Sequence, residues 1–133
     1  MSNQFKNYAQ GTFAEDIRKF VGMSEKNLTK KFRRVSLKAL GMVVIDTPVK
    51  TGCARGNWNV QIGNPNTDFH PEKADKAGGA TITEGKSVID TSEPDKTLFL
   101  TNSTPYIGIL EFKKNMVHLA VTALKNALEH GQI

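Results

Sequence analysis

The longest regular pattern in this sequence is the segment SEKNLTKKFRRVSLKALGMVVID, residues 24–46. Its apolar side chains recur at alternating spacings of four and three, which is the pattern of one face of an α-helix. These residues are Leu28, Phe32, Val35, Ala39 and Met42. Ser24 is a candidate N-cap, and the helix must end before Pro48 because the residue preceding a proline avoids the α region. The sequence therefore predicts a helix of about six turns.

The segment after this helix, DTPVKTGCARGNW, predicts a sharp reversal of the chain. Pro48 has a locked φ, and Gly52 is free to take a positive φ, so the two together favour a tight corner. The next residues, NWNVQIG, alternate with Trp58, Val60 and Ile62 on one face, which predicts a half-buried strand. We expect Trp58 to anchor this strand against the long helix by burying a large aromatic surface.

Residues 64–79 predict a long loop, because they are rich in Pro, Gly, Asn and Asp and contain almost no aliphatic side chains. Loops of this length in a compact domain are often functional or mobile. The segment that follows, ATITEGKSVIDT, is ambiguous, and a short helix is one interpretation. A strand is then predicted over residues 97–101, and the turn of residues 102–105 stops it and places Tyr106 at the start of the next apolar segment.

The last segment, NMVHLAVTALKNALEHG, predicts a C-terminal helix that ends before Gly131. Its apolar residues on one helical face are Val117, Ala120, Val121, Leu124, Ala127 and Leu128. The order of helices, strand, loop, strand and helix predicts the α+β class. We expect a small mixed or antiparallel sheet packed against the long helix of the N-terminal half and the C-terminal helix.

The length of 133 residues fits a single domain, spanning 1–133. Within it, residues 1–11 are expected to form a flexible arm, and TFAEDIRKFVG a short helix. No apolar run approaches the length of a membrane span, so no membrane partner is expected. The single cysteine excludes an internal disulfide, and the polar start MSNQFKNYAQ lacks the apolar core of a secretory signal. Synthesis in the cytoplasm is therefore expected.

The net charge of +5 is unevenly distributed along the chain. Residues 1–63 hold 11 Lys and Arg against 4 Asp and Glu, a net +7, whereas residues 64–133 hold 7 against 9, a net −2. Four cations recur every four residues along the predicted long helix: Lys26, Lys30, Arg34 and Lys38. Like charges at this spacing repel, which favours an anionic neighbour such as the phosphates of DNA. A solvated helix face opposite the apolar stripe is the alternative. A small, basic, sequence-independent DNA-binding protein is thus one functional hypothesis.

Catalytic and metal sites find little support in the sequence. Cys53 beside Arg55 resembles a reactive thiol next to a cation, but a nucleophilic cysteine also needs a base, and no histidine stands near it in sequence. His70, His118 and His130 have no second ligand at metal-binding spacing. We therefore predict no catalytic residue, no cofactor and no metal, and interpret Cys53 as a small residue in a tight turn.

Several blocks resemble the tail-completion family, the small neck proteins that belong to the head–tail connector of tailed bacteriophages. The blocks are TPVKTGCARGNWNVQIG, AGGATI, LFLTNSTPYIGILEF and MVHLAV, and they occur in the family's order between residues 46 and 121. Two positions depart from the family pattern: Lys50 stands where an acidic residue is common, and Cys53 where a long side chain is common. Family members also carry a loop after the block that ends here at Phe112. Either this chain lacks that loop, or residues are missing between Phe112 and Lys113, which is the interpretation that the intact flanking blocks favour.

The resemblance implies a structural virion protein without catalytic activity. Copies would form a symmetric ring, expected to be a hexamer, at the junction between the capsid portal and the tail, with genomic DNA passing through its lumen. The implied partners are portal-side adaptor or stopper proteins and tail tube proteins, and the implied location is the neck of the virion after synthesis in the host cytoplasm. A tail terminator ring protein is an alternative within the same class.

Residue roles follow from the sequence and this resemblance together. The structural turn and anchor positions are Pro48, Gly52, Gly56, Trp58, Pro105 and Tyr106. The candidate DNA-facing positions are the four cations from Lys26 to Lys38, and Glu111 is a candidate for a charged contact between subunits. The long loop of residues 64–79 is a candidate arm for gripping neighbouring subunits.

Overall fold

The computed structural model describes residues 25–132, so the expected arm, the short helix before Gly22 and the Ser24 cap lie outside these residues. By its contacts the chain divides into two units, Met1–Lys30 and Lys31–Ile133. Of the first unit the structure describes residues 25–30, which open the helix α3 (Glu25–Asp46). The predicted long helix is therefore confirmed over 22 residues, and it ends before Pro48 as expected.

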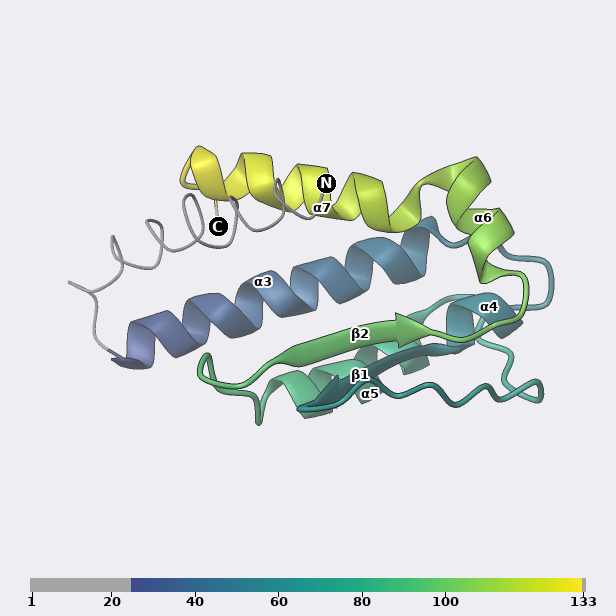
Figure 1. Cartoon of the computed structure of the whole chain (residues 1–133), viewed down its shortest axis with the longest axis horizontal. Helices are drawn as coiled ribbons and strands as arrows, with labels where there is room; N and C mark the ends of the chain where they lie inside the picture. Colours follow the sequence, from purple (N-terminus) through teal and green to yellow (C-terminus); the bar gives the residue numbers. More distant parts are fainter. Residues whose placement is uncertain (1–24, 133) are drawn as a thin grey trace. The chain divides into compact units, whose positions relative to one another are not determined.

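The described residues form an α+β fold of five helices and one antiparallel pair of strands, which confirms the predicted class (Figure 1). After α3 the elements are α4 (Cys53–Gly56), β1 (Trp58–Ile62), α5 (Gly79–Ile89), β2 (Leu98–Asn102), α6 (Ile107–Lys114) and α7 (Met116–Glu129). The strands pair with Trp58 opposite Asn102 and Ile62 opposite Leu98. None of the helices in residues 25–132 combines the length and apolar character that crossing a membrane requires.

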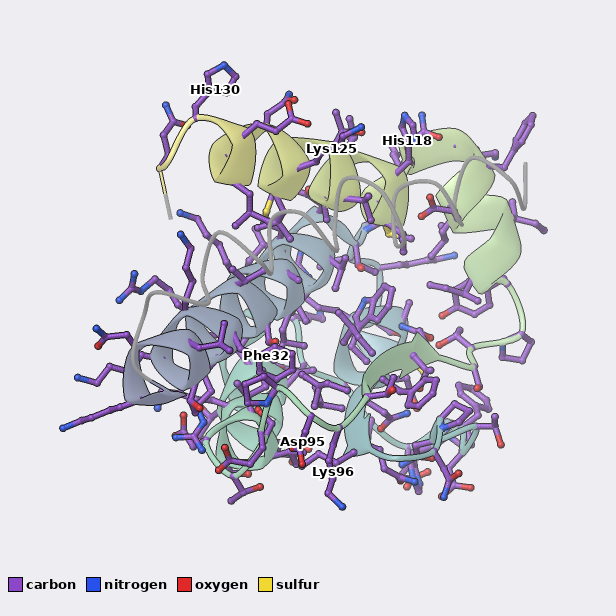
Figure 2. All side chains as sticks on the ribbon, turned by 60° about the vertical axis from the view of Figure 1, so that its left-hand side comes forward. Phe32, Asp95, Lys96, His118, Lys125 and His130 are labelled. Carbon is purple, nitrogen blue, oxygen red and sulfur yellow. The ribbon has the colours of Figure 1, made fainter. Side chains whose placement is uncertain are left out.

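From Lys31 onward, α3 lies between two layers, with α7 on one side and the strand pair with α5 on the other (Figures 1 and 2). The buried core joins all three layers: Leu40, Val43 and Val44 of α3, Trp58 of β1, Ile89 of α5, and Met116 and Ala120 of α7. Phe32, Val35 and Ala39, which the sequence pattern placed on the apolar stripe, are only half-buried. Because α3 is covered on two sides, it buries residues outside the predicted apolar stripe. Its most deeply buried residues, Leu40, Val43 and Val44, lie next to that stripe.

The ambiguous segment after the long loop is the helix α5. Its sequence contains Gly79, Gly85 and two threonines, residues of low helix propensity that weakened the prediction. Packing explains why a glycine stands in the middle of this helix. A Cβ on Gly85 would overlap the side chains of Leu40 and Val60, so the missing side chain allows α5 to approach both α3 and β1 closely.

The helices α6 and α7 meet at Asn115, whose left-handed φ of 53° ends one helix and starts the next. α6 runs without a break through Phe112 and Lys113, so the loop that the resemblance led us to expect is absent from this chain. In α7 the buried residues are Met116, Ala120 and Leu124. Two other members of the predicted apolar face, Val117 and Val121, are exposed, because α3 covers only the centre of that face.

Candidate functional site

The corner between α3 and β1, residues 46–58, is held by Arg55. Its Nε donates to the Thr47 carbonyl at 3.2 Å, and Nη2 donates to the carbonyls of Ile45 and Thr47, both at 2.8 Å. The last carbonyls of a helix lack partners within the helix and carry partial negative charge, so a guanidinium at this position caps the helix. Nη1 donates to the Lys76 carbonyl at 2.6 Å and thereby attaches the long loop to the same side chain.

Trp58 ties the start of β1 to the end of α3. Its indole Nε1 donates to the Thr47 hydroxyl at 2.8 Å, and that hydroxyl donates to the Val43 carbonyl at 2.6 Å. Both residues are buried, with 6% of Trp58 and none of Thr47 exposed. A buried indole N–H needs a partner, and Thr47 supplies it while keeping its own donor satisfied.

Gly52 lies where the long loop crosses the corner. Its φ is +87°, and its carbonyl accepts hydrogen bonds from the amides of Gly56 at 2.9 Å and Asp75 at 3.1 Å. A Cβ at this position would lie 2.7 Å from the Lys76 backbone nitrogen and 2.8 Å from the Asp75 backbone nitrogen. Only glycine combines this φ with so close an approach of a second backbone segment. Gly56 is buried beneath the same part of the loop.

Asn57 fixes the middle of the long loop. This buried side chain donates from Nδ2 to the carbonyls of Cys53 at 2.8 Å and His70 at 2.9 Å, and its Oδ1 accepts from the His70 amide at 2.7 Å. The loop is bonded to the strands as well, since the Asp68 carbonyl accepts from Asn59 and the Asn66 carbonyl accepts from Thr101. The loop is therefore attached along its length to other parts of the same chain.

Asp75 ends the loop and starts α5. Its Oδ1 accepts from the Gly78 amide at 2.9 Å, while Oδ2 accepts from the Thr81 amide at 2.8 Å and the Thr81 hydroxyl at 2.6 Å. Desolvation by burial raises the pKa of Asp75, but the hydrogen bonds from Thr81 and Gly78 and the nearby Arg55 charge outweigh it, so the pKa is lowered from its ordinary value of 3.8. The ionised carboxylate is thus the form that the fold stabilises.

This carboxylate predicts an acid-sensitive contribution to stability. A folded-state pKa below the unfolded value gives stability that is present above the unfolded pKa and is lost as pH falls through the folded pKa. At pH 7, Asp75→Asn is expected to lower the free energy of unfolding by about 1–3 kcal/mol, because its single acceptor oxygen cannot replace both carboxylate oxygens, so the Gly78 bond or the two Thr81 bonds are lost.

Urea unfolding from pH 7 down to pH 3 tests this prediction. The difference between the wild type and Asp75→Asn should shrink once the pH falls below 3.8, the ordinary pKa of the carboxyl group. Asp68→Asn is the matched control, since Asp68 is exposed in the same loop. A difference that stays constant across this range would contradict the assignment of the effect to the carboxylate charge.

The described groups around Cys53 do not form a catalytic arrangement. Its sulfur lies 3.7 Å from the Pro71 carbonyl oxygen, 3.9 Å from that of His70 and 3.5 Å from the Asn57 side-chain nitrogen. Burial and the hydrogen-bonded Cys53 thiol raise the pKa of Tyr106. Among the described residues, the polar contacts of the sulfur are thus carbonyls, an amide and a phenol, and none of these is the general base that a catalytic cysteine needs. Within residues 25–132 no cluster of three or more metal-ligating side chains forms.

The two turns that the sequence singled out come together. Asn102, at the end of β2, donates from Nδ2 to the Ala54 carbonyl at 2.8 Å and accepts the Thr104 amide at 3.0 Å. The exposed Pro105 and the partly exposed Tyr106 follow, and the Tyr106 hydroxyl reaches Cys53. Half-buried Pro48 stands at the opposite end of the corner. One hydrogen-bonded unit thus joins the corner to the turn before α6.

Comparisons of this chain with known protein families, curated proteins and solved structures found no match. The unit is therefore interpreted from its own chemistry. Its side chains are directed at backbone carbonyls and amides of the same chain, an arrangement that fixes backbone geometry. Sequence reasoning missed Asn57 and the structural roles of Arg55 and Asp75. The available signal for Arg55 and Asn57 was their position beside Gly56. For Asn57 and Asp75 it was also the residue type, since Asn and Asp readily bond nearby backbone in turns.

The other predicted positions lie apart from this unit. The side chains of Lys26, Lys30, Arg34 and Lys38 are all exposed along α3. Their neighbour Arg33 instead donates to the Ser92 carbonyl at 2.9 Å and pairs with Glu93 at 3.2 Å. Glu111 accepts hydrogen bonds from the amides of Val117 at 2.9 Å and His118 at 3.3 Å, so it caps the first turn of α7 within its own chain.

Proposed function

We propose that this chain is a structural subunit of the neck of a tailed bacteriophage and has no catalytic role. Copies form a ring, expected to be a hexamer, that completes the tail, contacts portal-side adaptor or stopper proteins and tail tube proteins, and lets DNA pass. The observation that carries the proposal is that its two longest blocks of resemblance, around Gly52 and around Pro105, meet in one hydrogen-bonded unit.

This unit suits a scaffold better than a reaction site. Arg55, Asn57 and Asp75 form hydrogen bonds with backbone groups of their own chain. A ring that transmits load between capsid and tail needs subunits whose helices and strands keep fixed relative positions. The long loop is held to the strands and to the corner, so in this proposal it contributes a fixed ridge to the neighbouring subunit and not a free arm. The tail terminator ring remains the alternative within this class.

Imaging of the neck in intact particles tests the proposal. We expect the protein in purified virions, as one ring between portal and tail, and we expect particles lacking it to have unattached or incomplete tails. Purified protein examined by negative-stain microscopy should give rings of a single symmetry. A protein that is strictly monomeric and absent from purified particles would overturn the proposal.

The exposed cations of α3 favour a second candidate function, sequence-independent DNA binding outside a ring. Lys26, Lys30, Arg34 and Lys38 have no ion pair with other residues in the described part of the chain, so their charges are available to phosphates. Replacing Lys30 and Arg34 by glutamate is expected to weaken binding to a short duplex. It should also reduce the slope of log affinity against log salt by about two, one for each lost phosphate contact.

Salt-dependent fluorescence anisotropy on random-sequence duplexes measures this effect. Lys50→Glu with Lys96→Glu is the matched control, because both lysines are exposed and lie outside α3. Tight binding by the isolated wild-type chain that the α3 variant loses would favour this second function. Equal salt slopes for the α3 variant and the control would exclude the α3 cations as the DNA contact.

A further inference from the structure

The helix α7 has a wider apolar surface than its own chain covers. Its polar side chains form one arc of the helix, and Figure 2 shows two of them, His118 and Lys125, directed away from α3. The buried residues Met116, Ala120 and Leu124 face the core. Between the two arcs, Val121 is 59% exposed on one flank and Leu119 is 52% exposed on the other. A helix that served only its own core would carry polar residues on these flanks.

The helix α6 also carries exposed apolar side chains. Tyr106 just before it, Ile109 and Phe112 stand three residues apart, so they share one face of the helix. They are 42%, 60% and 86% exposed. Phe112 is the most exposed of the large apolar side chains in the described residues. Burying a phenylalanine side chain stabilises a protein, so this position forgoes that gain within its own chain.

The exposed area is of the size that a protein interface uses. A buried aromatic side chain removes about 150–250 Å² from water, and Phe112 retains most of its share for a partner. With the other exposed apolar residues of α6 and α7, the available area is on the order of several hundred Å², a large part of the ~800 Å² that each partner contributes to a standard interface. An exposed apolar area of this size marks contact sites more often than free surface.

A second, smaller apolar surface lies at the corner. Ile45 is 52% exposed and Val49 is 40% exposed. The Ile45 side chain lies beside Gly78, with Cδ1 3.3 Å from where a glycine Cβ would stand, so it faces the start of α5. In both views α5 and α7 lie on opposite sides of α3 (Figures 1 and 2). A head-to-tail ring of identical subunits needs two different surfaces on each subunit, and these two apolar surfaces lie on different parts of the chain.

We infer that the α6–α7 surface of one copy packs on the Ile45–Val49 surface of the next copy, head to tail. We call the first the α6–α7 surface (Tyr106, Ile109, Phe112, Val117 and Val121), which leaves out Leu119 on the opposite flank of α7. The inference rests on the proposed ring and adds to it the two faces that close it. Because the surfaces differ, an open row of copies keeps one surface of each kind unpaired at its two ends until the ring closes.

Two single variants and their mixture test this arrangement. Phe112→Asp places a charge on the α6–α7 surface, and Val49→Asp places one on the corner surface. Each variant alone is expected to be monomeric by light scattering coupled to size-exclusion chromatography, under conditions where the wild type forms rings. Mixing them should give a dimer and nothing larger, because one intact surface of each kind remains between the two chains. Thr122→Asp, on the exposed polar arc of α7, is the matched control and should keep the ring.

The outcomes separate the inference from the proposed function. Wild-type rings that persist in Phe112→Asp would overturn the inference and leave the ring proposal standing. Two folded monomeric variants, verified by circular dichroism, that fail to dimerise on mixing would also overturn the head-to-tail pairing. Binding of the wild type to anionic lipid vesicles that Phe112→Asp alone abolishes, with its rings intact, would assign the α6–α7 surface to a membrane instead. A wild type that stays monomeric at high concentration and is absent from purified particles would overturn both.

Discussion

Replacement of Arg55 by alanine is expected to lower the free energy of unfolding by about 3 kcal/mol or more, one of the two largest effects predicted for a single substitution. The guanidinium makes four hydrogen bonds to the carbonyls of Ile45, Thr47 and Lys76. Hydrogen bonds to a charged group contribute about 1.5–3 kcal/mol, and their loss leaves carbonyls of the last turn of α3 without a partner.

Urea unfolding followed by far-ultraviolet circular dichroism measures this loss. Arg55→Lys is expected to recover only a small part of it, because an ammonium cannot reproduce the planar fork that reaches three carbonyls at once. Lys50→Ala is the matched control, since Lys50 is an exposed cation in the same corner and should change stability by no more than about 0.5 kcal/mol. An Arg55→Ala variant within 1 kcal/mol of the wild type would show that the cap does not support the corner.

Gly52→Ala is expected to be comparably damaging for a different reason. An L-residue at the Gly52 φ of +87° costs about 1–2 kcal/mol. The added Cβ would also stand 2.7–2.8 Å from the backbone nitrogens of Lys76 and Asp75, and main chain cannot swing aside as a side-chain tip can. We expect a total loss of about 3 kcal/mol or more, with the long loop displaced from the corner.

Comparison with Gly63→Ala separates the cost of the positive φ from the cost of the backbone overlap. Gly63 has a similar φ of +90°, but a Cβ there has no heavy atom within 4 Å. It should therefore lose only the conformational cost of about 1–2 kcal/mol. Thermal unfolding of both variants measures the difference, which is the cost of the backbone overlap. Equal losses in Gly52→Ala and Gly63→Ala would mean that the loop does not press on Gly52.

Local periodicity and turn chemistry predicted most of the fold. The spacing of apolar residues predicted α3 and α7, and the alternation that starts at Trp58 predicted β1. The second strand was predicted over residues 97–101, one residue earlier than β2. These patterns arise from contacts that each element makes with a single layer. They left α5 ambiguous, with a short helix as one interpretation, because its two glycines lower helix propensity and its formation depends on packing against Leu40 and Val60.

The candidate site was only partly predictable for the same reason. The sequence indicated that the residues around Gly52 build a corner, and it interpreted Cys53 as a small residue in the turn. It gave no means of knowing that Arg55 reaches Lys76, or that Asn57 holds His70, since these partners are 21 and 13 residues away. The exposure of Phe112 could not be predicted either. Phe112 lies in an apolar segment, and the sequence does not indicate which apolar side chains of that segment are left exposed.

The cap on α3 has a consequence for the order in which the chain acquires its structure. The carbonyls at the end of α3 accept hydrogen bonds from Arg55, which lies eight residues after Thr47 in the sequence. Arg55 makes all its hydrogen bonds only once the Lys76 carbonyl is in place. A chain growing from the ribosome therefore exposes an unfinished helix end until the long loop has emerged. The last turn of α3 should gain protection from hydrogen exchange together with the loop, as one cooperative step, and later than the middle of the same helix.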